Sequence, residues 1–326
     1  MIIIAADWLP YVLPLQRPWQ TSQGQVLERR GKLLCLRNDR SLSGWGDCAP
    51  LPEFGIDEPA ARAFAEEMAH LDLVAQSAGL PLHAWLSGDP AVASLAVNSN
   101  LGAISGLSEG ALQASLDAGF QVLKIKVGLA APAEEIARLR ELAAGLPATI
   151  KLRLDANAAW SLPEARQFLQ ACTTLPIEGI EEPLRHPVPD ELAQLQAGLP
   201  FPLALDESCH LLTPAFFRHP PLHRLVLKPA RHGGLLKSME IALRARAAGL
   251  ECIVTSSLES SCGLLACAQL AAAIAPNSVH GLGTAEWLAA DTGQAPRISG
   301  ARLYLPEGNG LGFVLAENWT KVQDPG

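Results

Sequence analysis

Short apolar segments with the composition of buried strands recur along the chain from Ser94 onward, and amphipathic helical segments lie between most of them. This alternation is typical of a parallel sheet whose strands are connected by helices. Eight such units predict an α/β fold built as a modified (β/α)8-type, TIM-like barrel, with a doubly wound open sheet as the alternative. No GxGxxG motif follows any strand, which weakens the dinucleotide-binding form of that alternative. The strand candidates are residues 94–100, 121–128, 149–157, 177–183, 202–208, 223–229, 251–257 and, more weakly, 278–283.

The residues on either side of this region have a different pattern. Residues 26–38 and 44–51 read as strands separated by turn residues, and residues 56–79 have helical spacing. Residues 298–317 are again strand-like, and we expect them to return and pair with the N-terminal region. The predicted domains are an α+β capping domain (1–92, with 304–326 returning to it) and a (β/α)-barrel catalytic domain (93–303).

Composition and charge exclude several classes of protein. The 326 residues carry a formal net charge of −8, whereas nucleic-acid binders usually have a basic face. The sequence has no run of about 18 apolar residues, so we expect no membrane span. The first residues lack the features of a signal peptide, and the seven cysteines form no CxxC pair. We therefore expect a cytoplasmic protein with reduced thiols and a small-molecule substrate.

Polar residues end the strand candidates from 121–128 onward, and they recur at intervals of 22 to 29 residues. One strand–helix unit has about this length, so these residues take equivalent positions at the C-terminal ends of successive strands. In a TIM barrel this rim carries the active site. The residues are Lys126, Asp155, Glu181, Asp206, Lys228, Ser256 and Gly281.

Three carboxylates on adjacent strands, Asp155, Glu181 and Asp206, would converge at this rim and repel one another unless a cation neutralises them. An all-oxygen set of ligands indicates Mg²⁺, which Mn²⁺ could replace. A substrate carboxylate bound to the metal would have its α-proton acidified. Lys124 and Lys126 share one face of the preceding strand, and nearby positive charge favours the neutral amine, so Lys126 is the candidate general base. The alternation of side chains does not decide whether Glu181 or its neighbour points inward.

These motifs resemble those of the enolase superfamily, muconate-lactonising subgroup, over nearly the whole chain. The resemblance implies that the three acids bind Mg²⁺, that Lys126 removes the α-proton of a carboxylate substrate, and that Lys228 stabilises the anion from the opposite face. It assigns the metal ligand to Glu181, and it gives Lys124 and Arg153 supporting positions. The matching motifs are KIK (124–126), RLDAN (153–157), EEP (181–183), DES (206–208) and KP (228–229).

Five further segments carry a finer resemblance: GWGDCAPLPEFG (44–55), LRLDANAAW (152–160), LKPARHGG (227–234), VTSSLESSCGL (254–264) and HGLGT (280–284). Within this subgroup they are most similar to the o-succinylbenzoate synthase family of menaquinone biosynthesis. That resemblance implies a syn-dehydration of a cyclohexadiene carboxylate through an enediolate, and an enzyme that often forms homo-oligomers. It also implies that the ends of the last two barrel strands bind substrate carboxylate through hydroxyl and backbone N–H groups. The segments after Glu58 suggest a capping domain with fewer helices than usual. The expected substrate-binding residues are Thr255, Ser256, Ser257 and Gly281.

Other interpretations remain open. Lys124 and Lys126 alone would fit a solvated edge strand, and Asp155 or Asp206 alone would fit a helix N-cap, but the repeated register disfavours these explanations jointly. An N-acylamino acid racemase, a dipeptide epimerase or a muconate cycloisomerase would use the same two lysines. A non-catalytic ligand-binding barrel would be expected to lack one or more of the five key residues, and a Schiff-base aldolase would not need the three acids.

Overall fold

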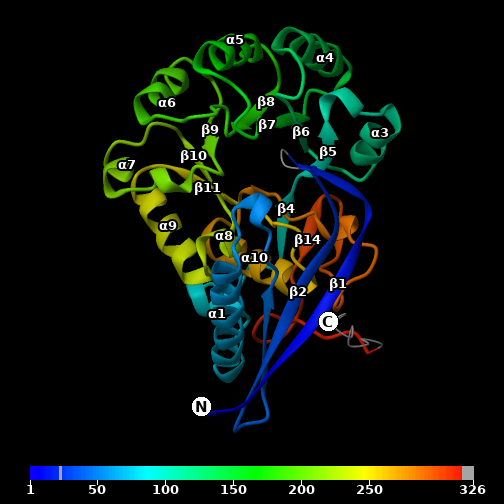
Figure 1. Cartoon of the computed structure of the whole chain (residues 1–326), viewed down its shortest axis with the longest axis vertical. Coiled ribbons are helices and arrows are strands. Elements are labelled where there is room, and N and C mark those ends of the chain that lie inside the picture. The colour runs from blue at the N-terminus through cyan, green and yellow to red at the C-terminus, as the bar shows by residue number, and fades with distance from the viewer. Residues whose placement is uncertain (22–23, 318–326) are drawn as a thin grey trace. The chain divides into compact units, whose positions relative to one another are not determined.

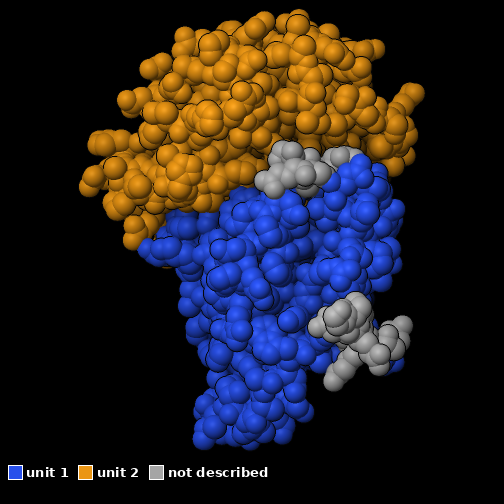
Figure 2. All heavy atoms as spheres, viewed as in Figure 1, with its two compact units in different colours: residues 1–96, 227–242, 254–326 blue, residues 97–226, 243–253 orange. Residues whose placement is uncertain are grey.

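The computed structural model describes residues 1–21 and 24–317 (Figure 1). It divides into two compact units, one made of residues 1–96, 227–242 and 254–326 and the other of residues 97–226 and 243–253 (Figure 2). The predicted boundaries near residues 92 and 304 stay a prediction, and residues 318–326 of the expected return segment lie outside the described residues.

The second unit is built on a curled, parallel sheet of seven strands with the order β11-β10-β9-β8-β7-β6-β5. Helices from the crossover connections lie around the outside of this sheet (Figure 1). The predicted mixed α/β fold, with a parallel sheet and helical crossovers, is confirmed. The strands are β5 (Ser99–Ala103), β6 (Val122–Lys126), β7 (Lys151–Asp155), β8 (Ile177–Glu181), β9 (Leu203–Leu205), β10 (Arg224–Leu227) and β11 (Glu251–Val254).

The crossover helices begin at the positions that capping chemistry favours. Before α5, the Ser161 side chain accepts from the backbone while the Glu164 side chain accepts from the Ser161 backbone N–H, which together form a capping box. Several of the helices carry proline in their first turn, where its missing N–H is not needed. The helices are α3 (Glu109–Asp117), α4 (Pro132–Gly145), α5 (Leu162–Cys172), α6 (Pro189–Gln196) and α7 (Pro214–Arg218).

The first unit contains the expected β-rich N-terminal region. Strands β1 (Ile3–Thr21), β2 (Gly24–Asn38) and β3 (Ser43–Cys48) form an antiparallel sheet, with β1 and β2 running as a long ribbon (Figure 1). Helix α1 (Glu58–Ser77) packs so closely on β3 that a Cβ at Gly46 would overlap a backbone carbonyl of the helix. Helix α2 (Leu82–Ser87) follows it, so the cap has few helices, as the sequence indicates.

The C-terminal segment pairs with the N-terminal region only in part. Strand β14 (Arg302–Tyr304) pairs with β4 (Ser94–Val97) rather than with β1, β2 or β3, within a sheet of order β12-β4-β14-β13. Farther along, the chain does pair with the N-terminal region, because Gly310 forms a parallel bridge with Pro81 and the Leu311 N–H donates to Asp72 of α1. The remaining strands of this sheet are β12 (Val279–His280) and β13 (Ile298–Ser299).

Three further helices follow β10 and β11. They are α8 (Pro229–His232), α9 (Leu235–Ala247) and α10 (Ser261–Ile274). Helix α10 is buried along most of its length and is correspondingly rich in alanine and leucine. Among the described residues, no helix combines the length and the apolar composition that a membrane crossing requires.

Candidate active site

The pairing of three parallel strands brings the first predicted residues to one edge of the sheet. Lys126 at the end of β6 is paired with Asp155 at the end of β7, and Asp155 is paired with Glu181 at the end of β8. Asp206 directly follows β9, the next strand in the sheet. Parallel strands with matched ends therefore place one lysine and three carboxylates along the same rim.

The ammonium group of Lys124 lies among these carboxylates. Its Nζ is 3.0 Å from Oδ2 of Asp155 and 2.5 Å from Oε2 of Glu181. Burial acts to lower the pKa of Lys124, but the charges of Asp155, Glu181 and Asp206 outweigh it and raise the pKa above its usual value. Lys124 is therefore a cation that holds the acidic cluster together and is unsuited to accept a proton near neutral pH.

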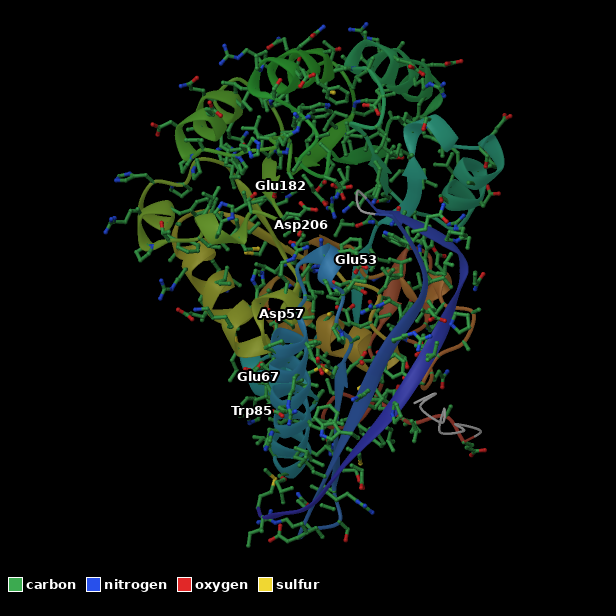
Figure 3. The ribbon with its side chains drawn as sticks, in the orientation of Figure 1. Glu53, Asp57, Glu67, Trp85, Glu182 and Asp206 are labelled. Atoms are coloured by element: carbon green, nitrogen blue, oxygen red, sulfur yellow. The ribbon has the colours of Figure 1, made fainter. Side chains whose placement is uncertain are left out.

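Glu181 and Glu182 take different positions, which the alternation of side chains left undecided. Glu181 points to Lys124, whereas the Glu182 carboxylate accepts hydrogen bonds from the Asp206 N–H at 2.8 Å and the Ser208 hydroxyl at 2.5 Å. Glu182 has a positive φ of 42°, and its side chain lies beside Asp206 (Figure 3). Burial raises the pKa of Glu182. Glu182 thus fixes the backbone that carries Asp206.

The acidic cluster has the donor chemistry of a site for a hard cation. Burial raises the pKa of Glu181, opposed first by the charge of Lys124. Its Oε1 atom is buried and has no hydrogen-bond partner among the described residues. In the part of the chain that the structure describes, no three Asp, Glu, His or Cys side chains are grouped as a formed metal site. Lys124 forms ion pairs with two of the three carboxylates. The three carboxylates are nevertheless buried and include one oxygen without a hydrogen bond, a set of ligands that suits Mg²⁺ or Mn²⁺.

Arg153 lies on the same face of β7 as Asp155, and Glu178 and Asn98 are among its partners. Its guanidinium is buried and donates to both carboxylate oxygens of Glu178 and to Oδ1 of Asn98. Arg224 binds Glu178 from the other side, with an N–O distance of 2.7 Å. The positive charge of Arg153 is close enough to lower the pKa of Glu181, so its support for the cluster is electrostatic.

One residue that the sequence interpretation missed holds the loop after Lys126. The buried carboxylate of Glu135, in the first turn of α4, accepts from the backbone N–H groups of Gly128, Leu129 and Ala130 at 2.7, 3.0 and 3.2 Å. Gly128 has a φ of +83°, which glycine adopts without strain. The only feature of the sequence that could have indicated this role of Glu135 is an acidic residue in the first turn of a predicted helix. Acidic residues are common there in any helix, so the feature is not specific.

Lys228 belongs to the first unit and directly follows β10. It is buried, and its Nζ lies 5.9 Å from the ring centroid of Phe54, at the edge of the range for a cation–π contact. Phe54 belongs to the segment 44–55 that contributes to the sequence resemblance. The structure therefore places an aromatic ring of the N-terminal region beside the second predicted catalytic lysine.

The expected substrate-binding segment, Thr255 to Ser257, uses its backbone internally. The N–H of Thr255 donates to Leu227, that of Ser256 to Gly281, and that of Ser257 to the Glu259 carboxylate. The Gly281 N–H donates to Val254. These four N–H groups therefore have partners within the protein, and substrate binding at these residues stays a prediction.

The hydroxyl groups of this segment differ from one another. The Ser256 hydroxyl donates to Glu259 at 2.6 Å and accepts from Thr284 at 2.7 Å. The hydroxyls of Thr255 and Ser257 are buried and have no hydrogen-bond partner within the described residues. These two hydroxyls are the groups of the segment that remain to bind a ligand.

Comparison with models of protein families assigns the chain to a family. The model for enolase C-terminal domain-like proteins matches residues 107–319, a range that contains all the predicted metal-binding and catalytic residues. The chain belongs to this family. The resemblance to the enolase superfamily is thereby confirmed.

Individual enolase-superfamily proteins are similar over most of the chain. The o-succinylbenzoate synthase of Yersinia pseudotuberculosis serotype I (strain IP32953) is 30% identical over 292 residues, covering 82% of this chain and 86% of that protein. Among solved structures, a substrate-liganded complex of the L-Ala-D/L-Glu epimerase from Bacillus subtilis has a TM-score of 0.87 and 25% identity, covering 96% of this chain and 99% of that one. A dipeptide epimerase from Enterococcus faecalis V583, complexed with Mg and the dipeptide L-Leu-L-Tyr, has a TM-score of 0.87 and 23% identity, with 96% and 99% coverage.

Proposed function

We propose that this enolase-superfamily enzyme is a lyase that removes water from 2-succinyl-6-hydroxy-2,4-cyclohexadiene-1-carboxylate to form 2-succinylbenzoate, the o-succinylbenzoate synthase reaction of menaquinone biosynthesis. The observation that carries the proposal is the register of β6, β7 and β8, which aligns Lys126 with Asp155 and Asp155 with Glu181. This arrangement combines a base with carboxylates that suit a metal. The similarity to a curated o-succinylbenzoate synthase favours this reaction among those that begin with removal of an α-proton.

Asp155, Glu181 and Asp206 would hold the metal, Mg²⁺ or Mn²⁺, and the unsatisfied Oε1 of Glu181 supports this assignment. When bound there, the metal supplies positive charge that makes the α-proton of a neighbouring carboxylate more acidic. Glu182 would keep Asp206 in place through its hydrogen bond to the Asp206 N–H. The dipeptide epimerase from E. faecalis, which has the same fold, was solved with Mg.

In this proposal Lys126 performs both proton transfers. Its neutral Nζ takes the proton from the ring carbon that bears the carboxylate, and the electron pair left behind forms the new ring double bond. The C–O bond at the neighbouring carbon breaks at the same face, because the elimination is syn, and the protonated Lys126 gives its proton to the departing hydroxide. Water and an aromatic ring result, and Lys126 is neutral again. The ammonium of Lys228 stabilises the developing negative charge from the opposite face of the substrate.

The test is a pair of assays on the purified full-length protein with Mg²⁺. One follows the absorbance change when the cyclohexadiene carboxylate becomes aromatic, and the other follows racemisation of N-succinyl amino acids by polarimetry. A kcat/KM for dehydration within the ordinary enzyme range of roughly 10⁴–10⁸ M⁻¹s⁻¹ supports the proposal. No dehydration, with racemisation present, contradicts it.

Racemisation or epimerisation of an N-acylated amino acid or dipeptide is the second candidate function. It is favoured by the similarity to the L-Ala-D/L-Glu epimerase, which is 25% identical over 96% of this chain. It would use Lys126 and Lys228 as acid and base on opposite faces of the α-carbon. The segment His280–Thr284 lacks the Asp-x-Asp pattern expected of dipeptide epimerases at the last barrel strand, which makes an N-acylamino acid the better racemase substrate.

A further inference from the structure

We propose that Arg29, in the N-terminal sheet, is a positioning residue that sets the place of the Thr255 and Ser257 hydroxyls for substrate binding. This inference rests on the proposed function, because it assigns those hydroxyls to the substrate of that reaction. Arg29 and the segment after β11 belong to the same compact unit.

Arg29 connects two backbone segments from inside the unit. Its guanidinium is only 2% exposed and donates from Nε to the Leu258 carbonyl at 3.0 Å. Its other nitrogens donate to the carbonyls of Ala49 and Pro50 at 2.7 and 2.8 Å. Each of these bonds goes to backbone, and three carbonyl oxygens are thereby fixed around one rigid, planar group.

The contact with Leu258 falls where the backbone needs support. Leu258 has a φ of +61°, a left-handed conformation that is unfavourable for a residue with a branched side chain. Such a residue keeps this conformation only when its surroundings impose it. Its N–H also donates to the Ser256 hydroxyl at 3.1 Å, and its carbonyl accepts from Arg29, so both polar groups of the strained residue are held.

A second anchor from the N-terminal sheet lies at the end of the same segment. The buried carboxylate of Asp47 accepts from the Ser260 N–H at 2.9 Å and from the Ser260 hydroxyl at 2.8 Å. Tyr11 donates to the other oxygen of Asp47 at 2.7 Å. The chain from Ser256 to Ser260 is therefore fixed at Leu258 and again at Ser260 by residues more than 200 positions earlier.

Two hydroxyl groups that this network leaves without a hydrogen bond indicate what it positions. Ser256 and the Ser257 N–H are bound by Glu259, while the hydroxyls of Thr255 and Ser257 are buried without a partner among the described residues. Buried hydroxyls usually find a hydrogen bond. Both hydroxyls belong to the same short segment after β11, and a substrate carboxylate or carbonyl oxygen is the complementary acceptor. A shift of Leu258 would move both hydroxyls.

The experiment compares Arg29→Met with Arg30→Met in the full-length protein with Mg²⁺. Arg30 is the adjacent residue of β2, with an exposed side chain paired to Glu28, so Arg30→Met controls for loss of charge and for strand propensity. We expect Arg29→Met to raise KM for the cyclohexadiene carboxylate about tenfold with kcat within about twofold, because binding away from the reacting atoms is lost. We expect Arg30→Met to match the wild type and Arg29→Lys to recover part of the affinity.

A double-variant cycle separates positioning from a merely structural role. Ser257→Ala alone should raise KM, and adding it to Arg29→Met should raise KM by less than the product of the two single effects, because both remove one interaction. A KM for Arg29→Met equal to that of Arg30→Met, or fully multiplicative effects, overturns the inference. If Arg29→Met does not fold, the same cycle with Arg29→Lys decides the matter. Absence of dehydration by the wild type instead contradicts the proposed function, and the inference with it.

Discussion

Lys124 and Lys126 lie two residues apart on one strand and share a face, yet their surroundings give them different chemistry. Lys124 is bound by Asp155 and Glu181, and its raised pKa keeps it protonated. Lys126, paired with Asp155 across the sheet and followed by the loop that Glu135 holds, is left as the base in the proposed reaction. The raised pKa of Lys124 makes it a poor base, so the proposal assigns proton removal to Lys126.

Replacement of Lys126 by alanine should abolish turnover while leaving the fold and metal binding intact. Loss of a positioned general base typically lowers the rate by roughly 10²–10⁴-fold, and we expect the same direction for Lys228→Ala. The measurement is kcat for dehydration, with Lys151→Ala as the control because Lys151 is exposed at the start of β7. Substantial activity in either variant would remove that lysine from the mechanism.

Glu182 should matter for metal affinity although it is not a proposed ligand. Its carboxylate binds the N–H of Asp206 and both polar groups of Ser208, and Glu182→Gln places an amide N–H where acceptors are needed. We expect Mg²⁺ binding, measured by titration calorimetry, to weaken about tenfold, as is usual when the support of a ligand is lost. Glu207→Gln is the control, since Glu207 is exposed and one position from Asp206. Equal Mg²⁺ affinity of the two variants would contradict the role of Glu182.

At the scale of elements, a network of charged side chains, largely buried except for Glu251, connects the strands of the parallel sheet. Glu178 on β8 binds Arg153 on β7 and Arg224 on β10, and Arg224 also binds Glu251 on β11 at 2.8 Å. Burial opposes ionisation of Glu178, but the two arginines outweigh it and lower its pKa to about 2. Four strands are therefore joined by one network whose strength depends on the charge of Glu178.

The network should give the protein a specific dependence of stability on pH. Because the pKa of Glu178 falls from its ordinary value of 4.5 to about 2 on folding, its stabilisation is present above pH 4.5 and is lost as the pH falls toward 2. The shift corresponds to at most about 3 kcal/mol. We expect Glu178→Gln to lower the urea midpoint clearly at pH 7 and much less at pH 3.

Glu134→Gln is the matched control for this measurement, because Glu134 forms an exposed ion pair with Arg138 that should contribute little. A difference between wild type and Glu178→Gln that stays constant from pH 7 to pH 3 would mean that the charge of Glu178 does not stabilise the sheet.

Element by element, local patterns predicted the strands of the parallel sheet well but not the pairing of the short C-terminal strand β14. The apolar runs with period-two charges were sufficient to locate β6 and β7, because a strand buried in a parallel sheet has a distinctive composition. The pairing of β14 with β4 was missed, since a three-residue strand carries no register information and fits any free edge. Glu135 and Arg29 were missed for a related reason: their roles depend on backbone groups whose positions only the folded chain defines.

At the scale of the whole molecule, the repeated strand–helix unit explains how distant residues acquire a common function. Lys126, Asp155 and Glu181 each end a strand and Asp206 directly follows one, so a fold that aligns strand ends also gathers these side chains. The same spacing is visible in the sequence, which is why the acidic cluster could be predicted. Placing the three buried carboxylates close together is unfavourable because their negative charges repel one another. A bound divalent cation would relieve this repulsion.

This relief predicts that Mg²⁺ stabilises the entire protein as well as activating it. A ligand that binds only the folded state raises stability in proportion to the logarithm of its concentration over Kd, so the melting temperature should rise with Mg²⁺ and fall with EDTA. EDTA should also abolish dehydration, and Mg²⁺ or Mn²⁺ should restore it. Asp206→Asn should lose most of the Mg²⁺-dependent shift, whereas Glu207→Gln should keep it. Activity that survives EDTA, or a melting temperature that Mg²⁺ does not change, would show that the acids serve Lys124 alone and that the reaction proceeds without a metal.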